Sequence, residues 1–218
     1  MLGFLGGTGP EGSGLALRLV LSGEQVVIGS RDAARAEETA RELNALAHLP
    51  EAYSEVHSGL NEEAARSADM VFIAVPFLAQ RALLESLKNH LDGKVVVDTV
   101  VPVTYSKGRF STAAVEEGSA ALQAQAILPG SRVVAAFQTV SAHALLDLAK
   151  PVEGDVVTCA DDEEAKALVM RLAERIPSLR AIDGGGLENS HYVEGITALL
   201  LNINRIYKSR SSLRVVGI

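Results

Sequence analysis

The stretch Leu2-Gly3-Phe4-Leu5-Gly6-Gly7-Thr8-Gly9-Pro10-Glu11-Gly12 decides the fold of this chain. A short apolar run leads into a G-x-G-x-x-G pattern, and residues 11–21 then carry apolar side chains at helical spacing. In a strand–turn–helix unit, the first glycine permits a tight turn, the second lets the backbone approach a pyrophosphate, and the third lets helix and strand pack closely. The pattern therefore predicts a dinucleotide site. The competing interpretation is a plain strand-to-helix turn whose glycines serve packing alone.

Apolar runs and amphipathic stretches continue to alternate along the chain, which predicts a parallel sheet with helical crossovers. We expect strands at 26–28, 52–56, 70–75, 94–101, 133–137, 155–159 and 179–182. We expect helices at 33–46, 62–66, 78–90, 120–128, 163–176 and 187–208, and a loop at 104–119. The predicted fold class is α/β: a Rossmann-type, doubly wound, mostly parallel sheet with a small C-terminal helical or α+β part.

Length and composition limit the possible classes of protein. At 218 residues, the chain fits a nucleotide-binding domain over 1–150 and a small second domain over 151–218. A net charge of −7 argues against nucleic acid as a partner, although Arg205, Lys208, Arg210 and Arg214 leave the last residues basic. No apolar run is long enough for a membrane span, and no signal peptide is expected. The single cysteine, Cys159, excludes an internal disulfide and suits the cytoplasm.

The end of the second predicted strand indicates which dinucleotide is bound. A site that prefers NAD places an acidic residue there to hold the ribose 2′-hydroxyl, whereas this chain has Gly29-Ser30-Arg31. Arg31 can grip a 2′-phosphate, Arg35 lies one helical turn later, and Ser30 can add a hydrogen bond. These residues favour NADP. The alternative is that Ser30 caps a helix and both arginines are solvated.

Three further stretches end predicted strands and therefore meet at one edge of the sheet. They are Ala74-Val75-Pro76-Phe77, Thr99-Val100-Val101-Pro102 and Gln138-Thr139-Val140-Ser141. All three combine apolar and small polar side chains, so they can wall a nicotinamide ring and a second flat molecule stacked on it. The alternative for each stretch is simple loop packing.

The sequence offers no catalytic side chain and no metal site. Its five histidines, of which His143 alone lies near a strand end, form no H-x-x-H or H-E-x-x-H arrangement. There is no G-x-S-x-G motif and no Cys/His pair, so covalent catalysis has no support. A dinucleotide site without an acid–base pair points to hydride transfer between two ring systems, which depends on approach and orientation.

Further motifs carry a resemblance to a known family. In chain order they are Gly6-Gly7-Thr8-Gly9, Gly14-Leu15-Ala16-Leu17-Arg18, Ile28-Gly29-Ser30-Arg31, Ala74-Val75-Pro76, Val101-Pro102-Val103, Gly118-Ser119-Ala120-Ala121, Gln123-Ala124-Gln125, Ala136-Phe137-Gln138-Thr139-Val140-Ser141-Ala142, Leu187-Glu188-Asn189 and Asn202-Ile203-Asn204-Arg205. With these motifs the chain resembles the NADPH:coenzyme F420 oxidoreductases, whose second partner is an 8-hydroxy-5-deazaflavin.

The resemblance implies hydride transfer between NADP(H) and coenzyme F420 in a homodimer. It implies that NADP contacts Thr8, Ser30, Arg31, Arg35 and the stretch from Ala74 to Phe77. The deazaflavin would stack on the nicotinamide near Val101, Pro102, Gln138 and Val140, with the C-terminal part closing the pocket and pairing subunits. Two alternatives stay open: an NADPH-dependent reductase with a flavin or imine acceptor, and a non-catalytic NADP-binding regulatory protein. The expected cofactor-binding set is Gly7, Thr8, Gly9, Pro10, Glu11, Gly12, Ser30, Arg31, Arg35, Ala74, Val75, Pro76, Phe77, Val101, Pro102, Gln138 and Val140.

Overall fold

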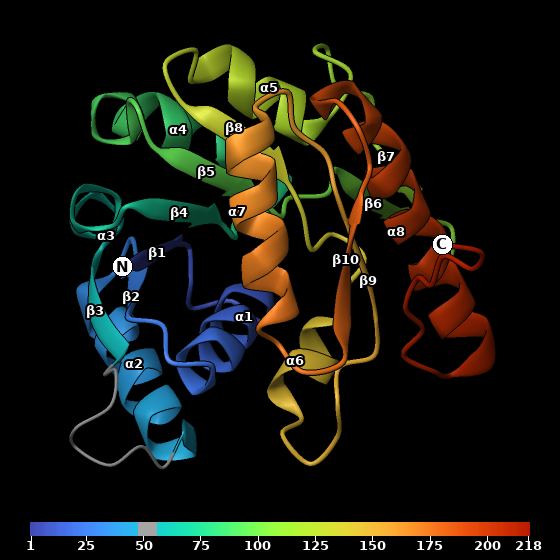
Figure 1. Ribbon diagram of the computed structural model, residues 1–218, viewed down its shortest axis with the longest axis horizontal. Coiled ribbons are helices and arrows are strands. Elements are labelled where there is room, and N and C mark those ends of the chain that lie inside the picture. Colours follow the sequence, from blue (N-terminus) through green and yellow to red (C-terminus); the bar gives the residue numbers. More distant parts are fainter. Residues whose placement is uncertain (48–55) are drawn as a thin grey trace.

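The centre of the protein is a six-stranded parallel sheet, seen in a computed structural model that describes residues 1–47 and 56–218 (Figure 1). The strand order is β3-β2-β1-β4-β5-β8. Successive strands of the chain are added on one side of β1 as far as β3, and on the other side of β1 from β4 onward. This is the doubly wound, Rossmann-type order that the sequence predicted. The strands are β1 (Leu2–Leu5), β2 (Val26–Ser30), β3 (Val56–Leu60), β4 (Met70–Ile73), β5 (Val95–Asp98) and β8 (Arg132–Ala135).

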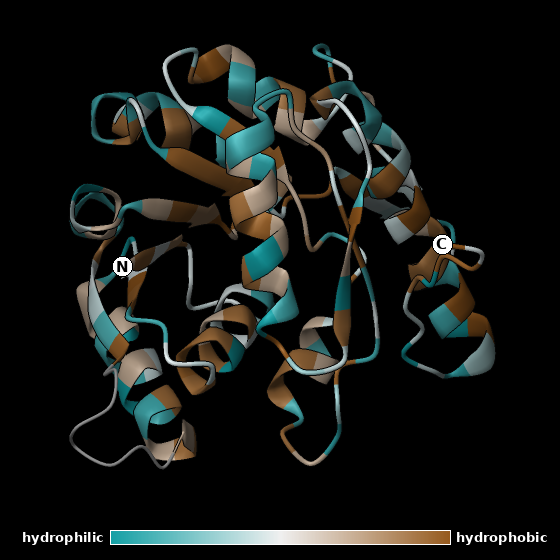
Figure 2. Ribbon diagram, viewed as in Figure 1, coloured by the Kyte–Doolittle hydropathy of each residue, from teal (hydrophilic) through white to brown (hydrophobic). Residues whose placement is uncertain are grey.

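Helices cover both faces of the sheet, because the central strands are apolar on consecutive residues and bury both of their sides. Figure 2 shows these strands in brown, while the helices outside them alternate between brown and teal. One face is covered by α1 (Pro10–Leu21), α2 (Ala33–Ala47), α6 (Ala142–Leu146) and α7 (Glu163–Glu174). The other face is covered by α3 (Asn61–Ser67), α4 (Phe77–Leu91) and α5 (Ala120–Ile127).

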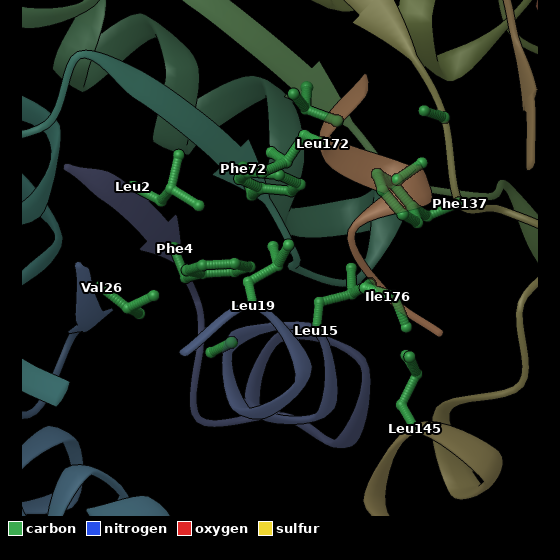
Figure 3. Packing of buried hydrophobic residues seen from close by; sticks show 14 of the residues in the cluster. Leu2, Phe4, Leu15, Leu19, Val26, Phe72, Phe137, Leu145, Leu172 and Ile176 are labelled. Carbon is green, nitrogen blue, oxygen red and sulfur yellow. The ribbon is translucent and has the colours of Figure 1, made fainter. Parts of the chain in front are cut away.

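Three aromatic rings form the middle of the core under α1. The ring of Phe4 stacks on that of Phe72 at a centroid distance of 4.6 Å, and Phe72 meets Phe137 at 6.0 Å (Figure 3). All three side chains are almost completely buried. They link β1, β4 and the segment after β8, so packing fixes the relative positions of strand ends that could hold a ligand.

The C-terminal part joins the sheet through a backbone bridge and ends on a long helix. Strands β9 (Gly154–Thr158) and β10 (Leu179–Asp183) pair in parallel, and Cys159 forms an antiparallel bridge with Ala135 at the end of β8. The 3₁₀ turn η1 (Leu187–Asn189) then leads into α8 (Ser190–Tyr207). One hydrophobic cluster includes side chains from both sides of residue 150, and the division into 1–150 and 151–218 stays a prediction.

Residues 208–218 have no regular secondary structure, but hydrogen bonds hold them against β9 and β10. The Asp155 carboxylate accepts from the backbone N–H of Val215, and Arg180 donates to the carbonyl oxygens of Val215 and Ile218. The tail is therefore attached to the C-terminal sheet rather than free of it.

Some sequence expectations differ from the structure. The expected loop at 104–119 contains a hairpin of β6 (Val103–Ser106) and β7 (Arg109–Thr112), and helix α6 lies where no helix was expected. Expected strand ends at 75, 101 and 137 lie two or three residues too far along, because the chain turns at the edge of the sheet. The strand expected at 52–56 lies outside the described residues except for Val56, which begins β3. None of the helices in the described ranges is both long and apolar enough to span a membrane.

Candidate functional site

The glycine loop follows β1 and begins α1, as the sequence predicted. The left-handed residue of the turn is Gly6, with φ of +70°, and its N–H donates to Asn61 Oδ1 at 3.0 Å. A Cβ on Gly12 would lie 2.7 Å from the Cα of Gly7, so close packing excludes a side chain there. A Cβ on Gly9 would have its nearest neighbour 3.8 Å away. The loop is therefore packed tightly at its base and open at Gly9, where Pro10 then starts the helix.

The end of β2 lies beside this loop and presents two cations. Gly7 N–H donates to the carbonyl oxygen of Gly29 at 3.0 Å, which connects the loop to β2. Ser30 is buried and its Oγ accepts from the N–H of Asp32, whose carboxylate caps α2. Arg31 and Arg35 are both exposed, and neither forms an ion pair with another described residue. This side of the loop therefore presents positive charge that is not neutralised by the protein.

The segment after β4 forms the next wall of the loop. Ala74 N–H donates to the carbonyl oxygen of Leu5 at 2.9 Å, and Val75 packs against Gly6. Pro76 precedes α4, which begins at Phe77. Ala74 and Val75 therefore border the glycine loop on the side opposite β2, and Pro76 and Phe77 follow them in the chain. Thr8 completes the loop between Gly7 and Gly9, and it is partly exposed.

The ends of β5 and β8 are tied to each other. Gln138 Nε2 donates to the backbone carbonyl of Asp98 at 2.9 Å, and Gln138 is buried. Phe137 before it has a φ of +71°, an uncommon value for a bulky residue, and Val140 N–H closes a turn onto the Phe137 carbonyl. Val101 is partly exposed and Pro102 is buried. The turn places Gln138 and Val140 side by side at the sheet edge with Val101.

Helix α8 closes this edge into a cleft. Thr197 Oγ1 donates to the carbonyl oxygen of Gln138 at 2.9 Å, and the Asn202 side chain makes two hydrogen bonds to the backbone of Phe110 in β7. The cleft has a volume of about 580 Å³. Its lining is Pro10, Glu11, Thr99, Val101, Phe110, Gln138, Thr139, Val140, Ser141, Ala142, His143, Thr197, Leu200, Leu201, Asn204, Arg205, Ser209, Arg210 and Ser211.

A second cavity of about 690 Å³ adjoins this cleft. It is shared along Thr139, Val140 and Ser141, and it continues toward Lys150 and the start of β9. The C-terminal tail borders both spaces through Ser209 and Arg210. The basic tail expected from the sequence therefore lies at the rim of the cleft.

Three carboxyl groups shielded from solvent lie in and under the cleft; Glu11 as a residue is partly exposed, but its Oε1 is buried. Burial raises the pKa of Glu11 to about 8. Burial also raises the pKa of Asp98 to about 8, although hydrogen bonds from Val100 and Gln80 act to lower it. Burial also raises the pKa of Glu194 to about 7, although its carboxylate accepts from the N–H groups of Ala120 and Ala121 at the start of α5. Of these three groups, only Glu11 lines the cleft.

The cleft brings together five of the residues expected from the sequence: Pro10, Glu11, Val101, Gln138 and Val140. Gly7, Thr8, Gly9, Gly12, Ser30, Arg31, Arg35, Ala74, Val75, Pro76, Phe77 and Pro102 lie at the same strand ends but outside its lining. Sequence reasoning did not select Asn61, Phe110, Thr197, Leu200 or Asn204. Asn204 lies inside one motif of the family resemblance, which was a usable signal, whereas the others enter through tertiary contacts.

Within residues 1–47 and 56–218, no cluster of three or more His, Cys, Asp or Glu side chains is arranged to hold a metal ion. Cys159 is buried, and burial raises the pKa of its thiol to about 11. The thiol is therefore un-ionised at neutral pH and is not a nucleophile.

Comparison with known proteins identifies relatives over most of the chain. Residues 1–102 match the family described as NADP oxidoreductase, coenzyme F420-dependent. A Methanothermobacter marburgensis protein named F420-dependent NADP reductase is 44% identical over 204 residues, which cover 92% of this chain and 90% of that protein. One of the same name from Methanocaldococcus jannaschii is 38% identical, with 97% and 95% covered.

One solved structure shares the fold of this chain. A crystal structure from Arthrobacter sp. FB24, provisionally called an F420-dependent NADP reductase, superimposes with a TM-score of 0.84 at 22% identity and covers 100% of this chain and 99% of that one. At that identity the likeness shows the fold, whereas the sequence relatives show the family. This chain belongs to the family of F420-dependent NADP reductases.

Proposed function

We propose that this protein transfers a hydride between NADP(H) and the deazaflavin coenzyme F420. The observation that carries the proposal is the cleft of about 580 Å³, which joins the first turn of α1 to the ends of β5 and β8 under α8. Ligands of open α/β sheets bind outside the carboxyl ends of the strands, where this cleft lies. The names of relatives up to 44% identical support the same reaction.

The residues present fit NADP. At Gly9 the loop is open, so backbone N–H groups can meet a pyrophosphate at the start of α1. Arg31 and Arg35 are exposed and unpaired among the described residues, so they are available to a 2′-phosphate beside Ser30. We expect the nicotinamide half to extend toward β4, β5 and β8, past Ala74, Val75, Pro76 and Phe77, because these strands follow β1 in the sheet on the side away from β2.

The deazaflavin is proposed to lie against Val101, Pro102, Gln138 and Val140. When bound, NADPH supplies the hydride and the deazaflavin ring accepts it. The chain contributes position: the turn at Phe137 fixes Gln138, and Thr197 holds that turn from α8. Leu200 and Leu201 add apolar surface that excludes water from the reacting rings. We assign no side chain as a covalent catalyst.

The test is to mix the protein with NADPH and oxidised F420 and follow the bleaching of the deazaflavin absorbance. We expect bleaching with NADPH and slower bleaching with NADH. Absence of bleaching with both nucleotides overturns the proposal. Reduction of a free flavin or an imine without reduction of F420 supports a reductase with another acceptor. NADPH binding without turnover of any acceptor supports a regulatory nucleotide-binding protein.

We also propose a homodimer in the cytoplasm, in which residues 151–218 close the pocket and pair the subunits. Tyr192, Leu199 and Ile206 recur every seven residues on α8 and are 64%, 58% and 66% exposed. Tyr105 of the hairpin that α8 anchors is 60% exposed. Such a stripe suits a second copy of the chain. The free thiol of Cys159 suits a reducing compartment.

A further inference from the structure

Two buried acceptor atoms, on residues that line the cleft, have no hydrogen-bond partner within residues 1–47 and 56–218. They are Oε1 of Glu11, in the first turn of α1, and Oε1 of Gln138, after β8. Both residues line the cleft of about 580 Å³. Buried polar atoms in native proteins are almost always paired, so an unpaired buried atom on a residue that lines a ligand cleft indicates a group that the ligand satisfies.

The orientation of Gln138 is fixed by its neighbours. Its Nε2 donates to the backbone carbonyl of Asp98 at 2.9 Å, and a flipped amide would turn Oε1 toward that carbonyl. Thr197 Oγ1 holds the backbone carbonyl of Gln138 from the other side. The side chain therefore presents an acceptor, and the group it suits is an N–H donor.

Glu11 adds a group of different character. Burial raises the pKa of Glu11 to about 8, with no hydrogen bond or neighbouring charge among the causes, so its carboxyl is un-ionised at neutral pH. The charged or titratable side chains that line the same cleft are His143 of α6, Arg205 of α8 and Arg210 of the tail. An un-ionised carboxyl offers one O–H donor and one carbonyl acceptor.

The strand order indicates which part of a dinucleotide reaches Glu11. Arg31 lies at the end of β2, on one side of the glycine loop, and the cleft lies on the other side, toward β5 and β8. With the 2′-phosphate at Arg31 and the pyrophosphate at Gly9, the nicotinamide half points into the cleft. The polar group of that ring is a primary carboxamide, which carries both an acceptor and N–H donors.

We propose that Glu11 is a specificity-determining residue that, together with Gln138, binds the nicotinamide carboxamide of NADP(H). Glu11 supplies a donor for the carboxamide oxygen, and Gln138 Oε1 accepts from the carboxamide N–H. This inference deepens the proposed function and rests on it only for the identity of the dinucleotide. It does not depend on which molecule accepts the hydride, because the contacts proposed here are made to NADP(H) alone.

The test measures dissociation constants by calorimetry at pH 7 for two ligands, NADPH and 2′-phospho-ADP-ribose, which lacks the nicotinamide. Glu11→Leu removes both polar atoms at similar size, Glu11→Gln keeps a donor and an acceptor, and Glu174→Leu on the exposed face of α7 is the control. For Glu11→Leu we expect about tenfold weaker NADPH binding and 2′-phospho-ADP-ribose binding within about twofold of the wild type. Glu11→Gln should stay within about threefold for both ligands, and the control should not change.

Unchanged NADPH binding by Glu11→Leu overturns the inference. Equal losses for both ligands also overturn it, because they indicate damage to the glycine loop. Gln138→Leu is a second test variant. We expect it, like Glu11→Leu, to weaken NADPH binding and to leave 2′-phospho-ADP-ribose binding nearly unchanged. A wild-type protein that binds NADPH but does not reduce F420 overturns the proposed reaction and leaves this test intact, so the two failures are distinguishable.

Discussion

Nε of Arg18, in the middle of α1, donates a hydrogen bond of 2.7 Å to the carbonyl oxygen of Leu145 at the end of α6, 127 residues further along the chain. The same guanidinium donates through Nη2 to the carbonyl oxygens of Ala144, Asp147 and Lys150. Arg18 is 8% exposed. One buried cation therefore caps α6 and holds the loop that borders the cleft and its neighbouring cavity.

Replacing Arg18 should cost much more stability than replacing an exposed arginine. Arg18→Met leaves four buried or partly buried carbonyl oxygens without their donor, and we expect a loss of about 3 kcal/mol or more in the free energy of unfolding. Arg41→Met is the control, because the Arg41 side chain is 72% exposed and pairs with Glu37 at 3.5 Å. Its expected effect is below about 0.5 kcal/mol. Denaturant unfolding measures both, and equal effects would contradict the capping role.

A second prediction concerns a directional chain of buried hydrogen bonds that ends on Asp98. Gln123 Nε2 donates to Gln80 Oε1 at 2.7 Å, and Gln80 Nε2 donates to Asp98 Oδ2 at 2.6 Å. Arg81 donates to Gln123 Oε1 at 3.0 Å. Because a guanidinium only donates, every amide in the chain is oriented toward Asp98. Asp98 Oδ1 accepts from Val100 N–H, so both oxygens of the Asp98 carboxyl group accept hydrogen bonds from the protein.

Asp98→Asn should therefore destabilise the fold although it conserves shape. Its NH₂ group would face either the amide of Gln80 or the N–H of Val100, and we expect a loss of about 1–3 kcal/mol. The matched control is Asp69→Asn, whose side chain is 89% exposed and pairs with the N-terminus. Thermal and denaturant unfolding compare the two variants. A loss no larger than that of the control would show that the chain is not directional.

The sequence was sufficient for the sheet and for one side of the site. The glycine stretch before α1 and the β-branched runs specify their structures locally, so the parallel sheet and the positions of Pro10, Val101 and Val140 could be predicted. The hairpin β6–β7 turns at Lys107 and Gly108, both with positive φ, and its pairing is fixed by Asn202 from α8. A Lys-Gly pair between alternating residues is only a weak sequence signal for a hairpin. The contact between the hairpin and α8 could not be predicted from the sequence.

The closed side of the cleft depends on contacts between residues far apart in the sequence. Thr197 reaches the backbone of Gln138 across 59 residues, and Asn61 reaches Gly6 across 55. Their residue types are ordinary in a helix or at a helix start, so no local pattern marks them. Glu11 was expected at the site as part of the glycine stretch, but the burial that makes its carboxyl un-ionised is a tertiary property.

The preference for NADP over NAD gives a third prediction. If Arg31 binds the 2′-phosphate, Arg31→Ala should weaken NADPH binding by about 1–3 kcal/mol and change NADH binding little. Arg66→Ala in α3, another exposed arginine, is the control and should change neither. Titration of each variant with both nucleotides measures the difference. Equal losses for NADPH and NADH would rule out a role for Arg31 in recognising the 2′-phosphate.

The raised pKa of Glu11 makes stability depend on pH in a defined direction. The folded pKa is about 8 and the unfolded value is 4.5, so its contribution is fully present below pH 4.5 and is lost as the pH rises through 8. Glu11→Gln removes this loss without removing a hydrogen bond, since the carboxyl has no partner among the described residues. At pH 9 we expect the variant to melt about 10 °C or more above the wild type, and at pH 5 the difference should be much smaller. A variant that melts below the wild type at pH 9 would contradict the burial of an un-ionised carboxyl.

The exposed stripe on α8 gives the last prediction. Leu199 is 58% exposed between Tyr192 and Ile206, and a second copy packed on this stripe would bury all three. Leu199→Lys places a charge in that contact and should convert a dimer into a monomer, as measured by light scattering after size exclusion. Leu168→Lys on α7, where the leucine is 40% exposed, should stay dimeric. If Leu199→Lys also stays dimeric, the subunits pair through another surface. If the wild type is monomeric, the stripe has a different partner.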